Sequence, residues 1–131
     1  MTSKPGHRWP IYSVRLLAVV LLLQVFGQAV LAGGFVSGDV GLLGIHSANA
    51  ILAVVTSMAL ILAAVLLLRP GRGPWWPIPV TVVLWLLIAT QVALGYARLL
   101  GGHIPLGVSI FGFVCALTWW SFAYRPKWIQ R

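Results

Sequence analysis

Acidic residues are almost absent from this chain of 131 residues, which contains a single aspartate, Asp39, and no glutamate. Charged residues of both signs make up only 8% of the sequence, against about 25% in an ordinary soluble domain. Hydrophobic residues make up 60%. Because so little polar surface is available to face water, the composition predicts one membrane domain and no soluble domain.

Cysteine is equally scarce. Cys115 is the only one, so no disulfide can form within the chain and a paired-cysteine metal or redox motif is excluded. The apolar runs also contain no acid–base pair and no nucleophile–base constellation, so an enzyme active on its own is not expected. The lack of acids in these runs further argues against a proton or cation transporter.

Four apolar runs are each long enough to cross about 30 Å of hydrocarbon as a helix. Short turns rich in glycine and proline separate them, which predicts that successive helices are antiparallel neighbours. The sequence therefore predicts an all-α, integral membrane, up-down-up-down four-helix bundle. The transmembrane domain is expected over residues 16–124, with spans at about 16–35, 42–68, 78–100 and 104–124 between tails at 1–15 and 125–131.

The basic residues give a net charge of +8 and lie at the ends of the apolar runs, with no stripe of basic and aromatic residues. The lipid bilayer is therefore the expected partner, and nucleic acid is not. An even number of crossings puts all but Arg98 on one side, which the positive-inside rule assigns to the cytoplasm. We expect a multi-pass protein of the plasma (inner) membrane with both termini in the cytoplasm. The residues on that side are Lys4, Arg8, Arg15, Arg69, Arg72, Arg125, Lys127 and Arg131.

Two histidines are expected at one depth on alternate spans. His46 and His103 each begin a helix that returns from an outer loop, 23 residues before Arg69 and 22 residues before Arg125, respectively. At about 1.5 Å per residue the two rings should differ by only one or two ångströms in depth, near the outer face. Spans two and four lie diagonally in such a bundle. His46 and His103 are therefore the predicted metal ligands of one bis-histidine haem b.

Small residues near these histidines are expected to leave space for a flat macrocycle. Ala50 and Gly107 follow His46 and His103 by one helical turn, and Gly27 and Gly95 lie on the flanking helices. Close packing of helices is the alternative explanation for these residues, because small side chains are common at helix contacts in membranes.

Polar residues near the outer side complete the predicted cofactor site. Arg98 could pair with a haem propionate, or it could reach lipid headgroups or pair with Asp39. Gln24 and Gln91, like Gln28, either form hydrogen bonds between helices or orient a histidine.

The two halves of the chain are alike. Gln24-Val25 is followed by Gly27 and later by His46, whereas Gln91-Val92 is followed by Gly95 and later by His103. Each half is thus predicted to form a helix pair, which gives a two-helix internal repeat. The pairs are expected to be related by a pseudo-twofold axis along the membrane normal.

At these residues the chain resembles one four-helix half of haem A synthase and, more distantly, cytochrome b561-like membrane cytochromes. Residues 91–98, Gln-Val-Ala-Leu-Gly-Tyr-Ala-Arg, are similar to the family's glutamine, glycine and arginine pattern at a helix end. The resemblance implies haem held between histidines on the second and fourth helices. Where the family's catalytic half has an acidic residue this chain has Leu43, and the outer-loop cysteine pair of many members is absent. The resemblance therefore points to the non-catalytic, haem b-binding half.

These observations lead to two hypotheses. The first is a membrane-embedded b-type haem protein, with one haem near the outer face, that serves electron transfer or haem handling. The alternative is a haem-free accessory or structural subunit of a larger membrane complex. A redox partner, a larger complex and a homo-oligomer all remain open.

Overall fold

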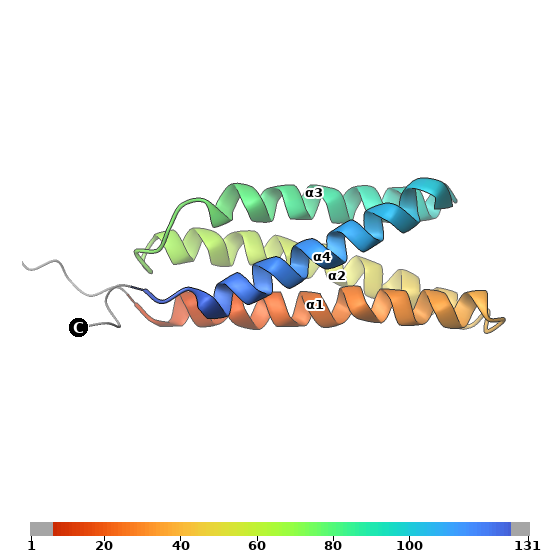
Figure 1. Ribbon diagram of the computed structural model, residues 1–131, viewed down its shortest axis with the longest axis horizontal. Coiled ribbons are helices and arrows are strands. Elements are labelled where there is room, and N and C mark those ends of the chain that lie inside the picture. Colours follow the sequence, from red (N-terminus) through yellow and green to blue (C-terminus); the bar gives the residue numbers. More distant parts are fainter. Residues whose placement is uncertain (1–6, 127–131) are drawn as a thin grey trace, which may run out of the picture.

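The computed structural model describes residues 7–126, which form four helices and no strand in that range. The predicted all-α four-helix membrane bundle is confirmed (Figure 1), since every helix is long and apolar enough to cross a membrane. The helices are α1 (Trp9–Val36), α2 (Leu42–Leu68), α3 (Pro77–Tyr96) and α4 (Leu100–Ala123).

The helices pack as a ring in chain order. α1 adjoins α2 and α4, and α3 adjoins the same two helices, whereas α2 and α4 lie diagonally without close backbone approach between residues 7 and 126. Figure 1 shows the α2–α3 connection at the same end of the bundle as the start of α1 and the end of α4, and the other two connections at the opposite end. We call these the basic end, which carries Arg8, Arg15, Arg69, Arg72 and Arg125, and the histidine end.

The helices begin and end at residues that differ from the expected spans. α1 begins at Trp9, inside the expected tail, because Pro10 in its first turn favours a helix start. α3 ends at Tyr96, short of residue 100, since Arg98 has a left-handed φ of 58°. α4 begins at Leu100, which places His103 inside its first turn. Residues 1–6 and 127–131 of the expected tails lie outside the described range.

Side chains join α1 to α4 near the basic end. The Arg15 guanidinium donates hydrogen bonds to the carbonyl oxygens of Ser121 (3.0 Å) and Tyr124 (3.2 Å) at the C-terminus of α4. Thr118 Oγ1 donates to the Ala18 carbonyl oxygen at 3.3 Å. Arg15 therefore lies within the bundle and satisfies carbonyls that the end of a helix leaves unpaired.

The buried core fills only the basic half of the bundle. Along α1 the last buried residue is Leu21, and along α3 it is Ile88, whereas the first buried residues of α2 and α4 are Ala53 and Ile110. Because lipid is as apolar as the side chains, helices in a membrane are stabilised mainly by close packing and not by removal of apolar surface from water. The histidine half is packed less tightly, and this is where the bundle can hold a ligand.

Candidate functional site

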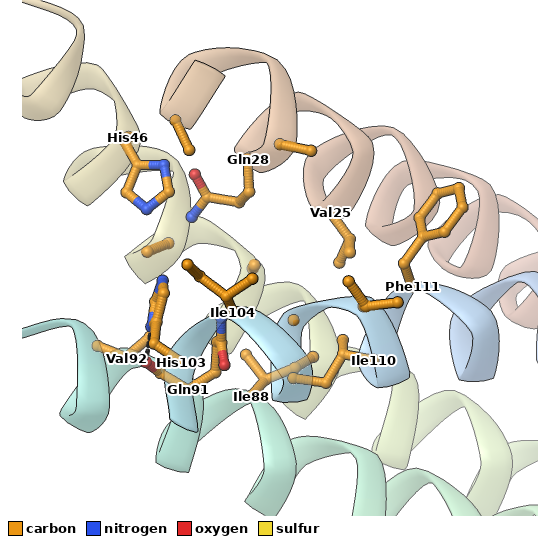
Figure 2. Close-up of a pocket in the computed structure, with 16 residues that line it drawn as sticks. Val25, Gln28, His46, Ile88, Gln91, Val92, His103, Ile104, Ile110 and Phe111 are labelled. Carbon is orange, nitrogen blue, oxygen red and sulfur yellow. Dashed lines mark hydrogen bonds between the residues drawn. The ribbon is translucent and has the colours of Figure 1, made fainter. Parts of the chain in front are cut away.

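A cavity of about 310 Å³ lies between all four helices in the histidine half of the bundle. Its size is at the lower end of the range of about 300–1,000 Å³ that is typical of ligand pockets. The wall is apolar except at His46 on α2, His103 on α4, Gln28 on α1 and Gln91 on α3. Figure 2 shows the two histidines at one end of the cavity, each beside a glutamine of the neighbouring helix.

The His46 and His103 rings have centroids 6.3 Å apart and planes inclined by 53°. An imidazole nitrogen lies about 2.0–2.1 Å from a transition metal and about 1.1 Å from its own ring centre, so trans imidazoles on one metal have centroids about 6.2–6.4 Å apart. The structure thus brings the two predicted ligands together, on diagonal helices, at a separation that suits one shared metal ion.

A backbone hydrogen bond orients His103. Its Nδ1 atom lies 2.9 Å from the Gln91 carbonyl oxygen, drawn as a dashed line in Figure 2. Since a carbonyl oxygen can only accept, Nδ1 carries the hydrogen, and Nε2 of the neutral ring keeps its lone pair. Metal-binding histidines are usually held in this way, with one nitrogen donating to the protein and the other free to bind.

Two glycines allow this geometry. A Cβ atom on Gly95 would lie 3.0 Å from His103 Cε1, so the ring can approach α3 only because that residue has no side chain. A Cβ atom on Gly107 would lie 2.9 Å from Gln91 Nε2, so Gly107 leaves room for the Gln91 amide. Both residues were predicted from the sequence as space for a macrocycle. In the structure they make space for protein side chains of the site.

Several buried polar atoms around the cavity lack a hydrogen-bond partner among the described residues. They include His46 Nδ1, Gln28 Oε1 and Gln91 Oε1. The backbone of Gln28 lies beside His46 on α1, as that of Gln91 lies beside His103, and the interaction at His46 is the weaker of the two. A buried polar group without a partner costs about 1–3 kcal/mol. Of the five such atoms among the described residues, three belong to residues that line the cavity.

The cavity is built with pseudo-twofold symmetry. On α1 and α3, lining residues pair at a spacing of 63 positions; on α2 and α4 they pair at 57 positions. The pairs are Val25 and Ile88, Gln28 and Gln91, Ala29 and Val92, then His46 and His103, Ala50 and Gly107, and Ala53 and Ile110. The predicted two-helix repeat is therefore present around the cavity, with one histidine and one glutamine from each half.

The register of the repeat differs from the sequence expectation. The match of Gln24-Val25 to Gln91-Val92 pairs Gln24 with Gln91, whereas the cavity pairs Gln28 with Gln91. Gln24 and Gln28 are one turn apart and share a face of α1, so helix periodicity cannot distinguish them. From the sequence, Gln28 was expected, like Gln24 and Gln91, either to form a hydrogen bond between helices or to orient a histidine, and only the packing of α1 places it at the cavity.

The other expected cofactor residues lie outside the cavity. The Gln24 backbone carbonyl accepts a hydrogen bond of 2.9 Å from Asn49 Nδ2, and a Cβ atom on Gly27 would lie 3.9 Å from the same nitrogen. Both residues therefore belong to the α1–α2 contact. Arg98 is exposed in the α3–α4 connection and does not line the cavity. Within residues 7–126 it makes no ion pair with Asp39, whose Oδ1 accepts a hydrogen bond from Gly41 N.

No protein-family model, curated protein or solved structure matches this chain. The function has to be argued from the chemistry of the site itself.

Proposed function

We propose that the protein binds one haem b between His46 and His103 and serves electron transfer or haem handling in the membrane. The observation that carries the proposal is the 6.3 Å separation of the two imidazole centroids at the end of an apolar cavity. When bound, the haem supplies reversible one-electron chemistry. With His46 and His103 both holding the iron, no coordination position would remain open, which favours electron transfer or haem handling over oxygen chemistry.

The ligand set favours haem iron over a bare metal ion. Among the described residues, no group of three or more His, Cys, Asp or Glu side chains is placed to hold a metal. A structural zinc ion takes four protein ligands, whereas a porphyrin brings four nitrogens of its own and needs only two from the protein. A pair of histidines with matched geometry fits the second case.

The remaining residues would hold and orient the group. The Gln91 carbonyl and Gly95 fix the orientation of the His103 ring. Ala50 and Gly107 are small and leave space in the cavity beside the histidines. The unpaired amide oxygens of Gln28 and Gln91 lie in that wall. Arg98 at the histidine end is the candidate partner for a propionate, because its guanidinium can bind a carboxylate through two parallel hydrogen bonds.

The proposed placement follows from charge. The arginines of the basic end belong in the cytoplasm by the positive-inside rule, which puts both termini there and the histidine pair near the outer face of the plasma membrane. An electron or a haem would then be exchanged with a partner at the outer side.

The test is an absorption spectrum of the purified protein in mild detergent, oxidised and then reduced with dithionite. A Soret band with sharp reduced α and β bands is expected in the wild type and should disappear in His46→Ala and in His103→Ala. His7→Ala is the matched control, because His7 is exposed before the first turn of α1 and should leave the spectrum unchanged. A protein that stays colourless after haem is added would overturn the proposal and favour the haem-free accessory subunit.

A further inference from the structure

The geometry points to a sideways opening of the cavity between α1 and α4, through which haem enters from the bilayer rather than from water. This inference rests on the proposed function for the identity of the ligand. We call this gap, lined by Ala29, Ile104, Val108 and Phe111, the lateral opening.

The lateral opening is where the pseudo-twofold symmetry of the cavity breaks. Ile104, Val108 and Phe111 of α4 line the cavity. Their counterparts 57 positions earlier on α2 are Ser47, Ile51 and Val54, and these do not line it. The cavity therefore extends outward on the α1–α4 side and not on the equivalent α2–α3 side.

The lining residues on this side also reach the outer surface of the bundle. The exposed fraction is 61% for Ile104, 69% for Val108 and 39% for Phe111, and Ala29 of α1 is exposed as well. On the opposite wall Ala53 and Ile88 are 3% and 4% exposed. A residue that both lines a cavity and faces outward marks the place where the cavity opens.

The path of α4 explains the gap. Near the basic end α4 is fixed to α1 by the Thr118 and Arg15 hydrogen bonds described above, and midway the Phe26 and Phe111 rings pack with centroids 6.4 Å apart. Figure 1 shows α4 then diverging from α1 toward the end of α3. The Phe26–Phe111 pair forms the inner edge of the lateral opening, and beyond it α1 presents Gln28, Ala29 and Ala32 to the cavity.

The chemistry of the lateral opening selects what can pass. Its walls carry no charged and no hydrogen-bonding side chain, and a span of this length places them against hydrocarbon. A water-soluble ligand would lose its hydration there without compensation. A flat macrocycle dissolved in the bilayer meets this cost only at its two propionates, and its apolar ring can pass between these walls to the histidine pair.

The test narrows the lateral opening with two indole rings and compares it with a matched control. The blocked variant is Ala29→Trp combined with Val108→Trp. The control is Leu23→Trp combined with Ile51→Trp; these are exposed positions on α1 and α2 outside the cavity, and Ile51 is the pseudo-twofold counterpart of Val108. Each haem-free protein is placed in phosphatidylcholine nanodiscs with an aryl diazirine dissolved in the lipid, irradiated, and mapped by mass spectrometry.

Adducts at Ala53 are the readout, because this residue lines the cavity and is otherwise buried. The blocked variant should lose Ala53 adducts by at least about fivefold, since close-packed rings leave no passage, while the control keeps them. Equal Ala53 labelling in the blocked variant, or an equal loss in the control, would overturn the lateral opening whether or not haem binds.

Haem loading then tests the ligand. Haem supplied in vesicles should reach the wild type and the control at the same rate and the blocked variant about tenfold more slowly. Equal loading rates in all three would overturn entry by this route. A third outcome combines two results: the blocked variant loses Ala53 labelling, but the wild type never takes up haem. This outcome would overturn the haem-binding function and leave the lateral opening in place.

Discussion

His103 Nδ1 lies 2.9 Å from the backbone carbonyl oxygen of Gln91, which ties the first turn of α4 to the last turns of α3. The contact exists because Gly95, one turn further along α3, lets the ring lie against the backbone. His103 is thereby oriented before a ligand binds. The backbone of Gln28 lies beside His46 in the equivalent position on α1, with a weaker interaction.

Gly95→Ala should weaken haem binding without unfolding the bundle. The new methyl group would lie 3.0 Å from His103 Cε1 and would push the ring away from the Gln91 carbonyl. Because orienting contacts of this kind typically contribute 10–100-fold to metal affinity, we expect the haem Kd to rise by about that factor. Titration of the haem-free protein with haem, followed at the Soret band, measures the change.

Gly27→Ala is the control for this prediction. Gly27 and Gly95 each follow the glutamine–valine pair of their half of the chain, but a methyl group on Gly27 would lie at an ordinary 3.9 Å from Asn49 Nδ2. Its haem affinity should stay within about twofold of the wild type. Equal losses in both variants would show that glycine acts through general helix packing and not through His103.

Replacement of Gln28 by leucine should have opposite effects on the empty and the haem-bound protein. The Gln28 Oε1 atom is buried without a partner among the described residues, so removing it should stabilise the haem-free bundle by about 1 kcal/mol. If the amide serves the ligand, the same change should lower haem affinity several-fold. Thermal unfolding in detergent and haem titration give the two values.

Gln24→Leu separates the two effects. Its Oε1 atom is also buried and unpaired in the described part of the chain, but Gln24 does not line the cavity. A similar gain in stability is expected, with unchanged haem affinity. A matching loss of affinity in this variant would contradict the assignment of Gln28 to the cavity.

The four helices and the similar depth of the two histidines could be predicted from the sequence, because both depend on hydropathy and on the number of residues along each span. Hydropathy gave four helices, and equal spacing of His46 and His103 from the following arginines indicated equal depth. The two rings do lie together, 6.3 Å apart. The depth of a residue along a helix follows from its number and the fixed rise per residue, so it can be predicted without knowing how the helices pack.

What could not be predicted depends on helix rotation and crossing. Gln24 and Gln28 share one face of α1, and only the packing of α1 against its neighbours places Gln28 at the cavity. Gly27 and Gly95 both follow a glutamine–valine pair in the sequence, yet of these two glycines only Gly95 lies beside a histidine. The lateral opening follows from the oblique path of α4, which no periodicity in the sequence encodes.

The proposed orientation can be tested with single cysteines introduced into a Cys115→Ala background. Ser37→Cys lies in the exposed α1–α2 connection at the histidine end, and Trp75→Cys lies in the exposed α2–α3 connection at the basic end. By the positive-inside rule, a membrane-impermeant maleimide should label Ser37→Cys on intact cells and Trp75→Cys only after permeabilisation. Neither change removes an arginine, so the topological signal is retained. The reverse labelling pattern would place the histidine pair at the cytoplasmic side.

Arg15→Gln should destabilise the bundle at the basic end and leave the haem site intact. The Arg15 guanidinium donates to the Ser121 and Tyr124 carbonyl oxygens, and hydrogen bonds from a charged group contribute about 1.5–3 kcal/mol each. Since a lysine at this position cannot reproduce the planar fork, Arg15→Lys should recover only part of the loss.

Arg125→Gln is the matched control, because Arg125 carries the same charge at the same end and is exposed. Thermal unfolding followed by circular dichroism should show a clear loss for Arg15→Gln and a change within about 0.5 kcal/mol for the control. Since His103 is held by the Gln91 carbonyl at the opposite end of α4 from Arg15, the reduced spectrum should keep its α band in all three variants below the unfolding temperature. Equal destabilisation by Arg15→Gln and Arg125→Gln would mean that net charge, and not the α1–α4 hydrogen bonds, supports this end of the bundle.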